Sequence, residues 1–337
     1  MSNFRMQEKN HQSVQQRPML IKYTCLFLLT LQNCCLILMM AYSRQRYDVS
    51  TGKLYFVSTA VVFAELVKII TSIIIVVVQQ IRASENIFSH FYQELFTDYV
   101  DFVKISVPGV IYMIQNNLSY IAISNLDATT FQVSYQLKIL TTGLFSVILL
   151  GKKLTIRQWI SLFLLFVGIS LVQLDNPTIQ NSIDSIDTEK SKFVGISMVG
   201  IVCLTSGFAG VYFEKVLKGS NKTLWIRNIQ MSAVGLISGV FLMMYRDYEN
   251  IQLFGILHGY DFIVYTIIFL QAFGGLLVAC VVKYADNILK GFSTSISIIL
   301  SCLFSLYIFN YIFGYIFICG VGIVSYSVYM YARYAAV

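Results

Sequence analysis

The sequence predicts an all-α integral membrane protein with ten transmembrane helices in two inverted five-helix repeats. Its 337 residues are 57% hydrophobic and only 12% charged, whereas soluble domains carry roughly twice that charged fraction. The apolar runs last about 20 residues, which suits helices and not the short alternating strands of a membrane barrel. The third observation is that a short motif of the first half of the chain recurs in the second half, which indicates a repeat.

Ten apolar runs define the expected spans. Each is long enough for a helix to cross a hydrocarbon core about 30 Å thick. They occupy residues 20–42, 54–80, 102–123, 128–150, 156–174, 193–216, 224–245, 262–283, 291–309 and 311–332. The polar tail, residues 1–19, lacks the pattern of a cleaved signal peptide, so we expect the first run to act as a signal-anchor.

Lysine and arginine in the connections predict the orientation. With the N-terminus in the cytosol, sixteen basic residues fall on the cytosolic side and six on the other. The positive-inside rule therefore predicts a cytosolic tail (1–19), a cytosolic C-terminus (334–337) and a lumenal linker (175–192). The net charge of +7 is explained by these loops, so no nucleic-acid partner is expected.

The linker divides the chain into halves of five spans, residues 20–174 and 193–333. Leu144-Phe145-Ser146 in the fourth span recurs as Leu303-Phe304-Ser305 in the ninth. Because five is odd, the second half must have the opposite orientation to the first. Inverted repeats are common in secondary transporters, where substrate binds near the membrane midplane between the repeats.

Lys138 lies near the middle of the fourth apolar run. A charge at that depth is costly and usually functional, and its own span contains no acidic residue. Tyr135 and Thr142 share its helix face, as their spacing shows. A lysine offers three donors to phosphate, and a tyrosine offers stacking area with a polar tip. This face therefore predicts a ligand with anionic oxygens and a flat ring.

Other polar positions also share helix faces or follow a span. These candidate site residues are Glu65 with Lys68, Tyr112 with Gln115 and Asn116, Ser206 with Gly207, and Lys290, which follows a helix start at Asp286 or Asn287. Simpler interpretations stay open. Glu65 and Lys68 could form a structural ion pair, the amides could join helices, and Lys290 could be a membrane-flanking residue that snorkels.

Motifs of enzymes and metal sites are missing from the sequence. It contains no His-Glu-x-x-His, no P-loop and no Gly-x-Ser-x-Gly, and its seven cysteines all fall in apolar runs as small buried side chains. We therefore expect no enzyme, no cofactor and no metal site. Without a P-loop, ATP is not expected to drive the protein directly.

Several stretches carry a family resemblance. They read QNNL at 115–118, ISNL at 123–126, YQLKILTT at 135–142, GFAGVYFEK at 207–215, RNIQ at 227–230 and KYADNILKGF at 283–292. With these motifs the chain resembles the Golgi nucleotide-sugar transporters of the drug/metabolite transporter superfamily. The resemblance covers residues 21–332 and both halves.

The resemblance implies an antiporter that brings a nucleotide sugar into the Golgi lumen in exchange for a nucleoside monophosphate. It implies that Lys138 and Lys290 meet phosphate, that Tyr112, Asn116 and Asn228 contact the nucleotide, and that Glu65 with Lys68 lines the sugar or phosphate region. The bilayer and a second copy of the chain, as a homodimer, are further expected partners. The endoplasmic reticulum is the alternative membrane.

The substrate expected from the resemblance is a UDP-sugar. The stretch QAFGGLLVA at 271–279 is similar to carriers of UDP-galactose and UDP-N-acetylglucosamine. Ser232 and Val234 depart from the CMP-sialic acid carriers. UDP-galactose is favoured, with UDP-N-acetylglucosamine and CMP-sialic acid as alternatives. A general metabolite exporter, a membrane glycosyltransferase and a scaffold are the other classes considered, and the acid-poor face around Lys138 argues against cationic substrates.

Overall fold

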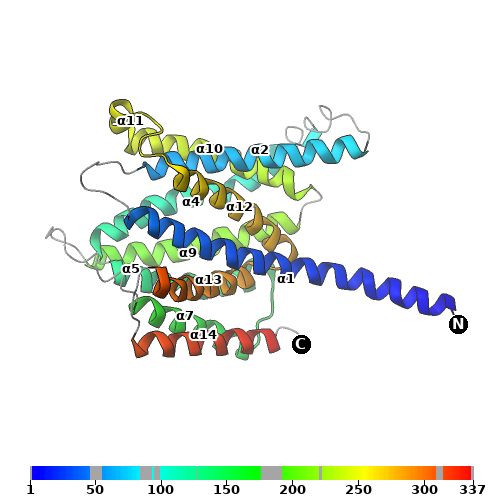
Figure 1. Cartoon of the computed structure of the whole chain (residues 1–337). Helices are drawn as coiled ribbons and strands as arrows, with labels where there is room; N and C mark the ends of the chain where they lie inside the picture. Colours follow the sequence, from blue (N-terminus) through cyan, green and yellow to red (C-terminus); the bar gives the residue numbers. More distant parts are fainter. Residues whose placement is uncertain are drawn as a thin grey trace.

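The computed structural model describes residues 2–45, 55–83, 93–94, 99–126, 128–175, 192–219, 222–308 and 314–334, with side chains inside some helices left out. Its longer elements are helices that pack into one bundle (Figure 1). These helices are α1 (Ser2–Gln45), α2 (Val57–Ala83), α4 (Tyr99–Asn125), α5 (Ala128–Tyr135), α6 (Lys138–Leu150), α7 (Ile156–Leu174), α9 (Lys192–Lys218), α10 (Leu224–Arg246), α11 (Tyr248–Phe254), α12 (Phe262–Tyr284), α13 (Asn287–Ile308) and α14 (Tyr315–Tyr334).

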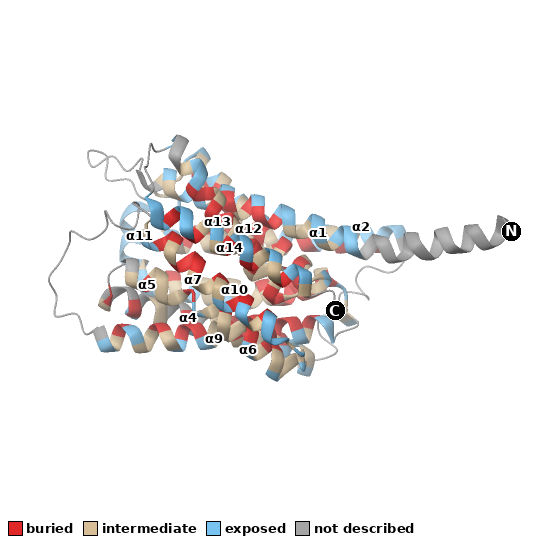
Figure 2. Ribbon diagram, turned by 90° about the horizontal axis from the view of Figure 1, so that it is seen from below, coloured by how far each residue is buried: buried red, intermediate tan, exposed pale blue. Residues whose placement is uncertain are grey.

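The bundle has the character of a membrane protein. Within the described residues, nine stretches of helix, the broken α5–α6 among them, are long and apolar enough to cross a bilayer. Large apolar side chains such as Phe193 and Phe262 are more than four-fifths exposed, and the buried residues run along the middle of the bundle (Figure 2). A hydrocarbon solvent removes the cost of that apolar exterior. The predicted class, an all-α integral membrane protein, is confirmed. The helix α4 covers the third predicted span but falls outside the nine.

Helix pairs from distant parts of the sequence make the bundle. Ser161 and Ser327 exchange hydroxyl-to-carbonyl hydrogen bonds of 2.9 and 2.7 Å between α7 and α14. Close packing of this kind, with small residues and hydroxyls between helices, is the usual device in membranes. The principal neighbours are α7 with α14, α4 with α9, α2 with α10, α6 with α9, α1 with α12, α1 with α13, α2 with α12 and α4 with α10.

The fourth predicted span, 128–150, is not a continuous helix. It divides into α5 and α6, with a turn at Gln136 and Leu137. The amides of these two residues donate to carbonyls three residues back, Val133 O and Ser134 O, at 3.1 Å each. Such tight turns inside a helix often mark a functional hinge or strain. Apolar periodicity could not reveal the turn, because its residues are compatible with either conformation.

Other boundaries differ in smaller ways. The ninth span begins at Asn287, four residues before the predicted start, because the Asp286 carboxylate accepts the Leu289 amide at 2.7 Å and caps the helix. The start agrees with the one expected at Asp286 or Asn287. The short helix α11 was not predicted. Residues 309–313, where the last two predicted spans meet, and most of the predicted linker, 176–191, lie outside the described residues.

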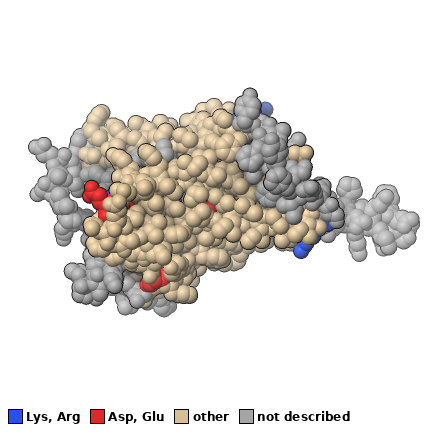
Figure 3. All heavy atoms as spheres, turned by 90° about the horizontal axis from the view of Figure 1, so that it is seen from above, with Lys and Arg blue, Asp and Glu red and all other residues tan. Residues whose placement is uncertain are grey.

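Both chain ends lie at the same end of the bundle (Figure 1). On the face shown in Figure 3, a wide band with almost no charge separates lysine and arginine at the right from most of the aspartate and glutamate at the left. Such a band flanked by charge is what a bilayer requires.

Candidate functional site

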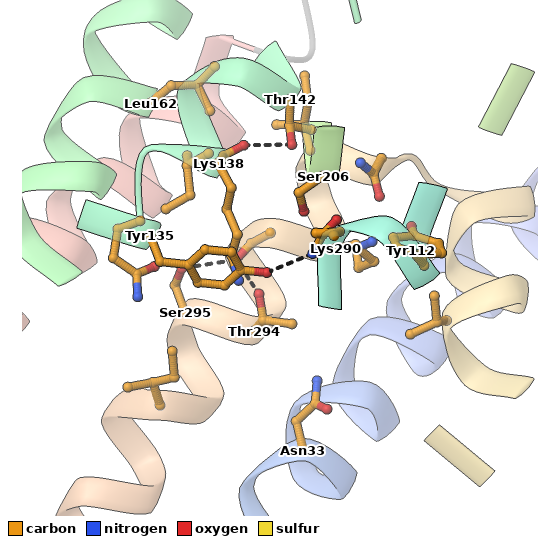
Figure 4. Close-up of a pocket in the computed structure, with 18 residues that line it drawn as sticks. Asn33, Tyr112, Tyr135, Lys138, Thr142, Leu162, Ser206, Lys290, Thr294 and Ser295 are labelled. Carbon is orange, nitrogen blue, oxygen red and sulfur yellow. Dashed lines mark hydrogen bonds between the residues drawn. The ribbon is translucent and has the colours of Figure 1, made fainter. Parts of the chain in front are cut away.

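A polar cavity of about 330 Å³ lies inside the bundle, between α1, α4, the α5–α6 turn, α9 and α13. Figure 4 shows Tyr135, Lys138 and Lys290 grouped at its centre. Its lining residues are Asn33, Tyr112, Gln115, Tyr135, Gln136, Lys138, Ile139, Thr142, Leu162, Ser206, Val278, Asn287, Ile288, Lys290, Gly291, Thr294, Ser295 and Ile298. Ligand pockets generally measure about 300–1,000 Å³, so this volume suits a small organic ligand.

Lys138 is the first residue of α6, directly after the turn. Its carbonyl accepts hydrogen bonds from the hydroxyls of Thr141 and Thr142, at 3.1 and 2.7 Å. The turn places the first residue of α6 at the cavity, so the positive end of the helix dipole and the charge of Lys138 act together there. The amides of Ile139, Leu140 and Thr141 donate to carbonyls of the turn, at Gln136 and Leu137.

The helix α9 holds the turn in place. The Thr141 hydroxyl donates to Cys203 O at 2.7 Å, and the Cys203 thiol lies 3.5 Å from Tyr135 O. A Cβ atom on Gly207 would lie 2.5 Å from the Thr141 hydroxyl and 2.8 Å from its carbonyl carbon. Only glycine therefore lets α6 approach α9 this closely. Gly207 positions α6 without lining the cavity.

Tyr135 gives Lys138 an aromatic partner. The Lys138 ammonium lies 4.0 Å from the centre of the Tyr135 ring, a cation–π contact. The ring of Phe131 also stacks with the ring of Tyr135, with centroids 5.8 Å apart and planes at 8°. Gln115 donates its amide to the Tyr135 hydroxyl at 3.4 Å. These contacts fix a flat aromatic surface in the cavity wall.

Lys290 stands in the first turn of α13, opposite the α5–α6 turn in the cavity wall (Figure 4). The carboxylates near this helix start are engaged by other groups. The buried Glu214 carboxylate accepts the backbone N–H of Asn287 at 2.8 Å, and Asp286 caps the helix. The ammonium of Lys290 is therefore left to face the cavity.

A cluster of charges lies beside the start of α13, which carries Lys290. Glu214, with its side chain 0% exposed, pairs with Lys152 at 3.0 Å and Lys218 at 2.8 Å. Lys152 also pairs with Asp286 at 3.3 Å. Lys152 follows α6, Glu214 and Lys218 belong to α9, and Asp286 precedes α13, so these four residues, here named the gate cluster, join three segments.

Glu65 and Lys68 form an ion pair at 2.7 Å on α2, as their spacing predicts. They line a second cavity of about 150 Å³ between α2, α4 and α10. Tyr112 lines both cavities. The two cavities therefore adjoin at Tyr112, with the second carrying a paired charge and the first carrying lysines alone.

The structure places the sequence-predicted residues in different positions. Tyr112, Gln115, Tyr135, Lys138, Ser206 and Lys290 line the first cavity, and Glu65 and Lys68 line the second. Gly207 packs on Thr141. Asn228 is buried on α10, where its amide donates to Leu224 O at 3.3 Å, and it lines neither cavity. Asn116 belongs to α4, and its side chain lies outside the described residues.

Several lining residues escaped the sequence-based selection. The polar ones are Asn33, Gln136, Asn287, Thr294 and Ser295. Asn287, Thr294 and Ser295 lie on α13 together with Lys290, so the helix period starting from Lys290 could have found Thr294. No sequence signal distinguishes Asn33 from its neighbour Gln32, which is buried against α12 through a 2.9 Å bond to Leu270 O.

The chemistry of the first cavity is that of an anion site with aromatic and amide groups. Two lysines line it, and no aspartate or glutamate appears among the described lining residues. Gln115 Oε1 and Asn287 Oδ1 are buried and have no hydrogen-bond partner within the described part of the chain. A buried acceptor without a partner is costly, so each can accept a hydrogen bond from a bound ligand.

A helical membrane bundle with a central polar cavity of this kind defines a carrier of anionic organic molecules. Comparison with known sequences gives the family: the profile of the nucleotide-sugar transporters matches residues 17–332. The chain belongs to this family of transporters, which are not enzymes.

Named relatives share much of the chain. The mouse UDP-galactose translocator is 43% identical over 312 residues, covering 93% of this chain and 78% of that protein. The dog UDP-N-acetylglucosamine transporter is 46% identical over 291 residues, covering 85% and 87%. A solved crystal structure with 13% sequence identity matches with a TM-score of 0.60 over 95% of this chain and 99% of that chain, which shows a shared fold.

Proposed function

We propose that the chain is a Golgi antiporter that moves a UDP-sugar, with UDP-galactose favoured, into the lumen in exchange for UMP. The observation that carries the proposal is the first cavity. Lys138 and Lys290 both line it, and no carboxylate lies among its described lining residues. A diphosphate or monophosphate neutralises such a pair, whereas a cationic metabolite would be repelled. The Golgi assignment rests on the motif resemblance.

The aromatic ring and the unpaired acceptors of the first cavity support a uridine nucleotide as the ligand. Tyr135 offers a flat face beside Lys138, and Gln115 Oε1 and Asn287 Oδ1 offer unpaired acceptors. Uracil carries an imide N–H that needs an acceptor, and aromatic stacking on a base contributes about 1–3 kcal/mol. Most of the nucleotide would then lie between α4, the α5–α6 turn and α13.

The sugar would extend past Tyr112 into the second cavity. Glu65 and Lys68, paired at 2.7 Å, present both a carboxylate and an ammonium to it, and sugar hydroxyls can donate to one and accept from the other. UMP fills only the first cavity in this arrangement, whereas a UDP-sugar reaches both.

The proposed architecture is ten spans in two inverted halves, residues 20–174 and 193–333, with both termini cytosolic. The packing supports it. If α1, α2, α4, α5–α6 and α7 correspond to α9, α10, α12, α13 and α14, then the α4–α9 contact corresponds to α12–α1, and α6–α9 corresponds to α13–α1. The contact α4–α10 corresponds to α12–α2, and α2–α10 and α7–α14 correspond to themselves. A two-fold axis in the membrane plane generates this pattern.

Alternating access then has a structural basis. The gate cluster joins Lys152 of the first half to Glu214 and Asp286 of the second, on the cytosolic side of Lys290 in the proposed orientation. Its ion pairs hold that side closed, and separating them opens it. An empty carrier would reorient slowly with Lys138 and Lys290 unpaired at depth, and a bound anion removes that penalty. Exchange follows.

The test is nucleotide exchange by purified protein in liposomes loaded with UMP. We expect uptake of labelled UDP-galactose to depend on internal UMP and to be lost in Lys138→Ala. Lys153→Ala removes a nearby exposed lysine and serves as the matched control with full exchange. Normal exchange by a correctly inserted Lys138→Ala protein, or equal uptake without internal nucleotide, would contradict the proposal.

UDP-N-acetylglucosamine is the second candidate substrate, because the relatives named for it are as similar as those named for UDP-galactose. The same liposomes decide between them by competition of each unlabelled UDP-sugar, with CMP-sialic acid as a third competitor. Preference for CMP-sialic acid would overturn the uridine assignment while leaving the carrier mechanism intact.

A further inference from the structure

A third cavity lies on the outside of the bundle, and none of its lining residues lines the first or the second cavity. It measures about 310 Å³ and forms a groove between the first turn of α7 and the last turns of α14. Its lining residues are Arg157, Tyr326, Tyr329, Met330, Arg333 and Tyr334, here named the α7–α14 groove. Two arginines and three tyrosines in one groove at a membrane-flanking position are an unusual concentration of donors.

The two arginines are held in defined positions. The Arg157 guanidinium lies 4.5 Å from the centre of the Tyr334 ring, a stacked cation–π arrangement. Arg333 donates to the Tyr329 hydroxyl at 2.9 Å. None of the described lining residues is acidic, and neither arginine has an ion pair within the described part of the chain. The positive charge of the groove is therefore not neutralised by the residues that form it.

The opposite end of the same helix pair is joined by a carboxylate. There the Asp175 carboxylate, at the end of α7, accepts the amides of Gly314 and Phe317 at 2.6 and 3.2 Å, at the start of α14. At the groove end, the first turn of α7 is capped by Thr155 and Gln158 instead. At the groove end the described lining residues supply two arginines and no carboxylate.

We propose that the α7–α14 groove binds the head group of an anionic phospholipid. The helix α14 lies at the edge of the bundle (Figure 1), and Tyr326 and Tyr329 are more than half exposed there, so a bilayer lipid reaches the groove directly. Arginine forks suit phosphate oxygens bidentately. Tyrosine is typical of the interface between hydrocarbon and water. The exposed apolar Ile156 and Ile160 of α7 would flank the acyl chains.

The positive charge of the groove selects lipids with a net negative head group. A zwitterionic lipid brings a choline or ammonium group that two arginines repel, whereas phosphatidylserine or phosphatidylinositol brings net negative charge. In the orientation proposed above the groove faces the cytosolic leaflet, which is rich in such lipids. The leaflet depends on that orientation, whereas lipid binding does not depend on the transported substrate.

The experiment is lipid binding to the full-length protein in detergent, measured by native mass spectrometry without nucleotide. Phosphatidylserine, phosphatidylcholine and inorganic phosphate are the probes. We expect phosphatidylserine to bind more tightly than phosphatidylcholine, and inorganic phosphate at the same concentration not to compete. Each arginine near an anionic head group contributes about fivefold in affinity, so Arg157→Gln/Arg333→Gln should weaken phosphatidylserine binding about 25-fold.

Control variants separate the site from general charge and from folding. Arg82→Gln/Arg246→Gln removes two exposed arginines at other helix ends and should leave binding unchanged, and Arg157→Lys/Arg333→Lys should retain most of it. Equal binding of both lipids to the unmodified protein, competition by free phosphate, or unchanged binding in the double glutamine variant would each overturn the proposal. UMP exchange by the same proteins is measured separately, in phosphatidylcholine liposomes. A failure of the proposed transport function can therefore be told apart from a failure of the lipid site.

Discussion

The two cavity lysines reach the same space by different structural routes. Lys138 follows a turn in the middle of a broken helix, with the Tyr135 ring 4.0 Å from its ammonium. Lys290 follows an ordinary capped helix start, next to carboxylates that other lysines already hold. Lys138 therefore depends on backbone geometry and an aromatic partner, and Lys290 depends on an ion network.

The difference teaches how a charge is kept at depth. At Lys138 the support is packing, because Gly207 and Cys203 of α9 hold Thr141 and with it the turn. At Lys290 the gate cluster absorbs the nearby negative charge so that the lysine stays available. Packing should fix the first site permanently, whereas ion pairs can separate when the carrier changes state.

The largest expected effect compares alanine at the two lysines. A hydrogen bond to a charged group contributes about 1.5–3 kcal/mol, so Lys138→Ala should weaken UMP binding about 10- to 150-fold. Lys290→Ala should fall at the lower end of that range, because Lys138 and the Tyr135 ring beside it remain in the cavity to hold the nucleotide. Binding of labelled UMP to purified protein measures both. A greater loss at Lys290 would reverse the comparison.

The next effect tests the ion network. Glu214→Gln should lower the free energy of unfolding by about 2 kcal/mol, since a buried partner of two lysines is removed but the lysines remain partly solvated. Thermal unfolding in detergent gives the change. Asp286→Asn is the milder comparison, because Lys152 keeps Glu214. If the loss of UMP binding free energy exceeded the loss of unfolding free energy, the cluster would belong to the binding site and not to the gate.

A smaller effect tests the packing at the turn. Gly207→Ala forces Thr141 away and should cost about 1–3 kcal/mol, as overpacking in a tight core does, with UMP binding weakened about tenfold through displacement of Lys138. Gly200→Ala on the same helix is the control, because a Cβ there meets nothing within 4 Å. Equal behaviour of the two variants would show that α9 does not position Lys138.

The smallest effect separates the tyrosine ring from its hydroxyl. Tyr135→Phe keeps the ring under Lys138 and loses only the 3.4 Å bond from Gln115, so UMP binding should fall about twofold. Tyr135→Leu also removes the cation–π contact and should cost about a further two- to fivefold. If the leucine variant bound UMP as tightly as the unmodified protein, the Tyr135 ring would not contribute to binding at Lys138.

Much of this molecule was predictable from the sequence, and the reasons are local. Long apolar runs gave the helical membrane class, because a bilayer demands backbone hydrogen bonds within each segment. Lys138 was found by its cost, and Tyr135 and Thr142 by the helix period. Asn228 was expected to contact the nucleotide from the family motif alone; its side chain bonds to Leu224 O within α10 and lines neither cavity. A motif carries a position but not the rotation of its helix in the bundle.

The sequence by itself determined that this chain spans a membrane, which ends are basic, and that a lysine deep in an apolar run needed a ligand or a partner. Only the tertiary structure decided that the fourth span breaks beside that lysine, that Gly207 is required by Thr141, and that Asn33 and Asn287 complete the cavity. Hydrophobicity and charge act on each residue by itself and can be read along the chain. A tight turn, a close helix approach and an unpaired acceptor exist only between residues that folding brings together.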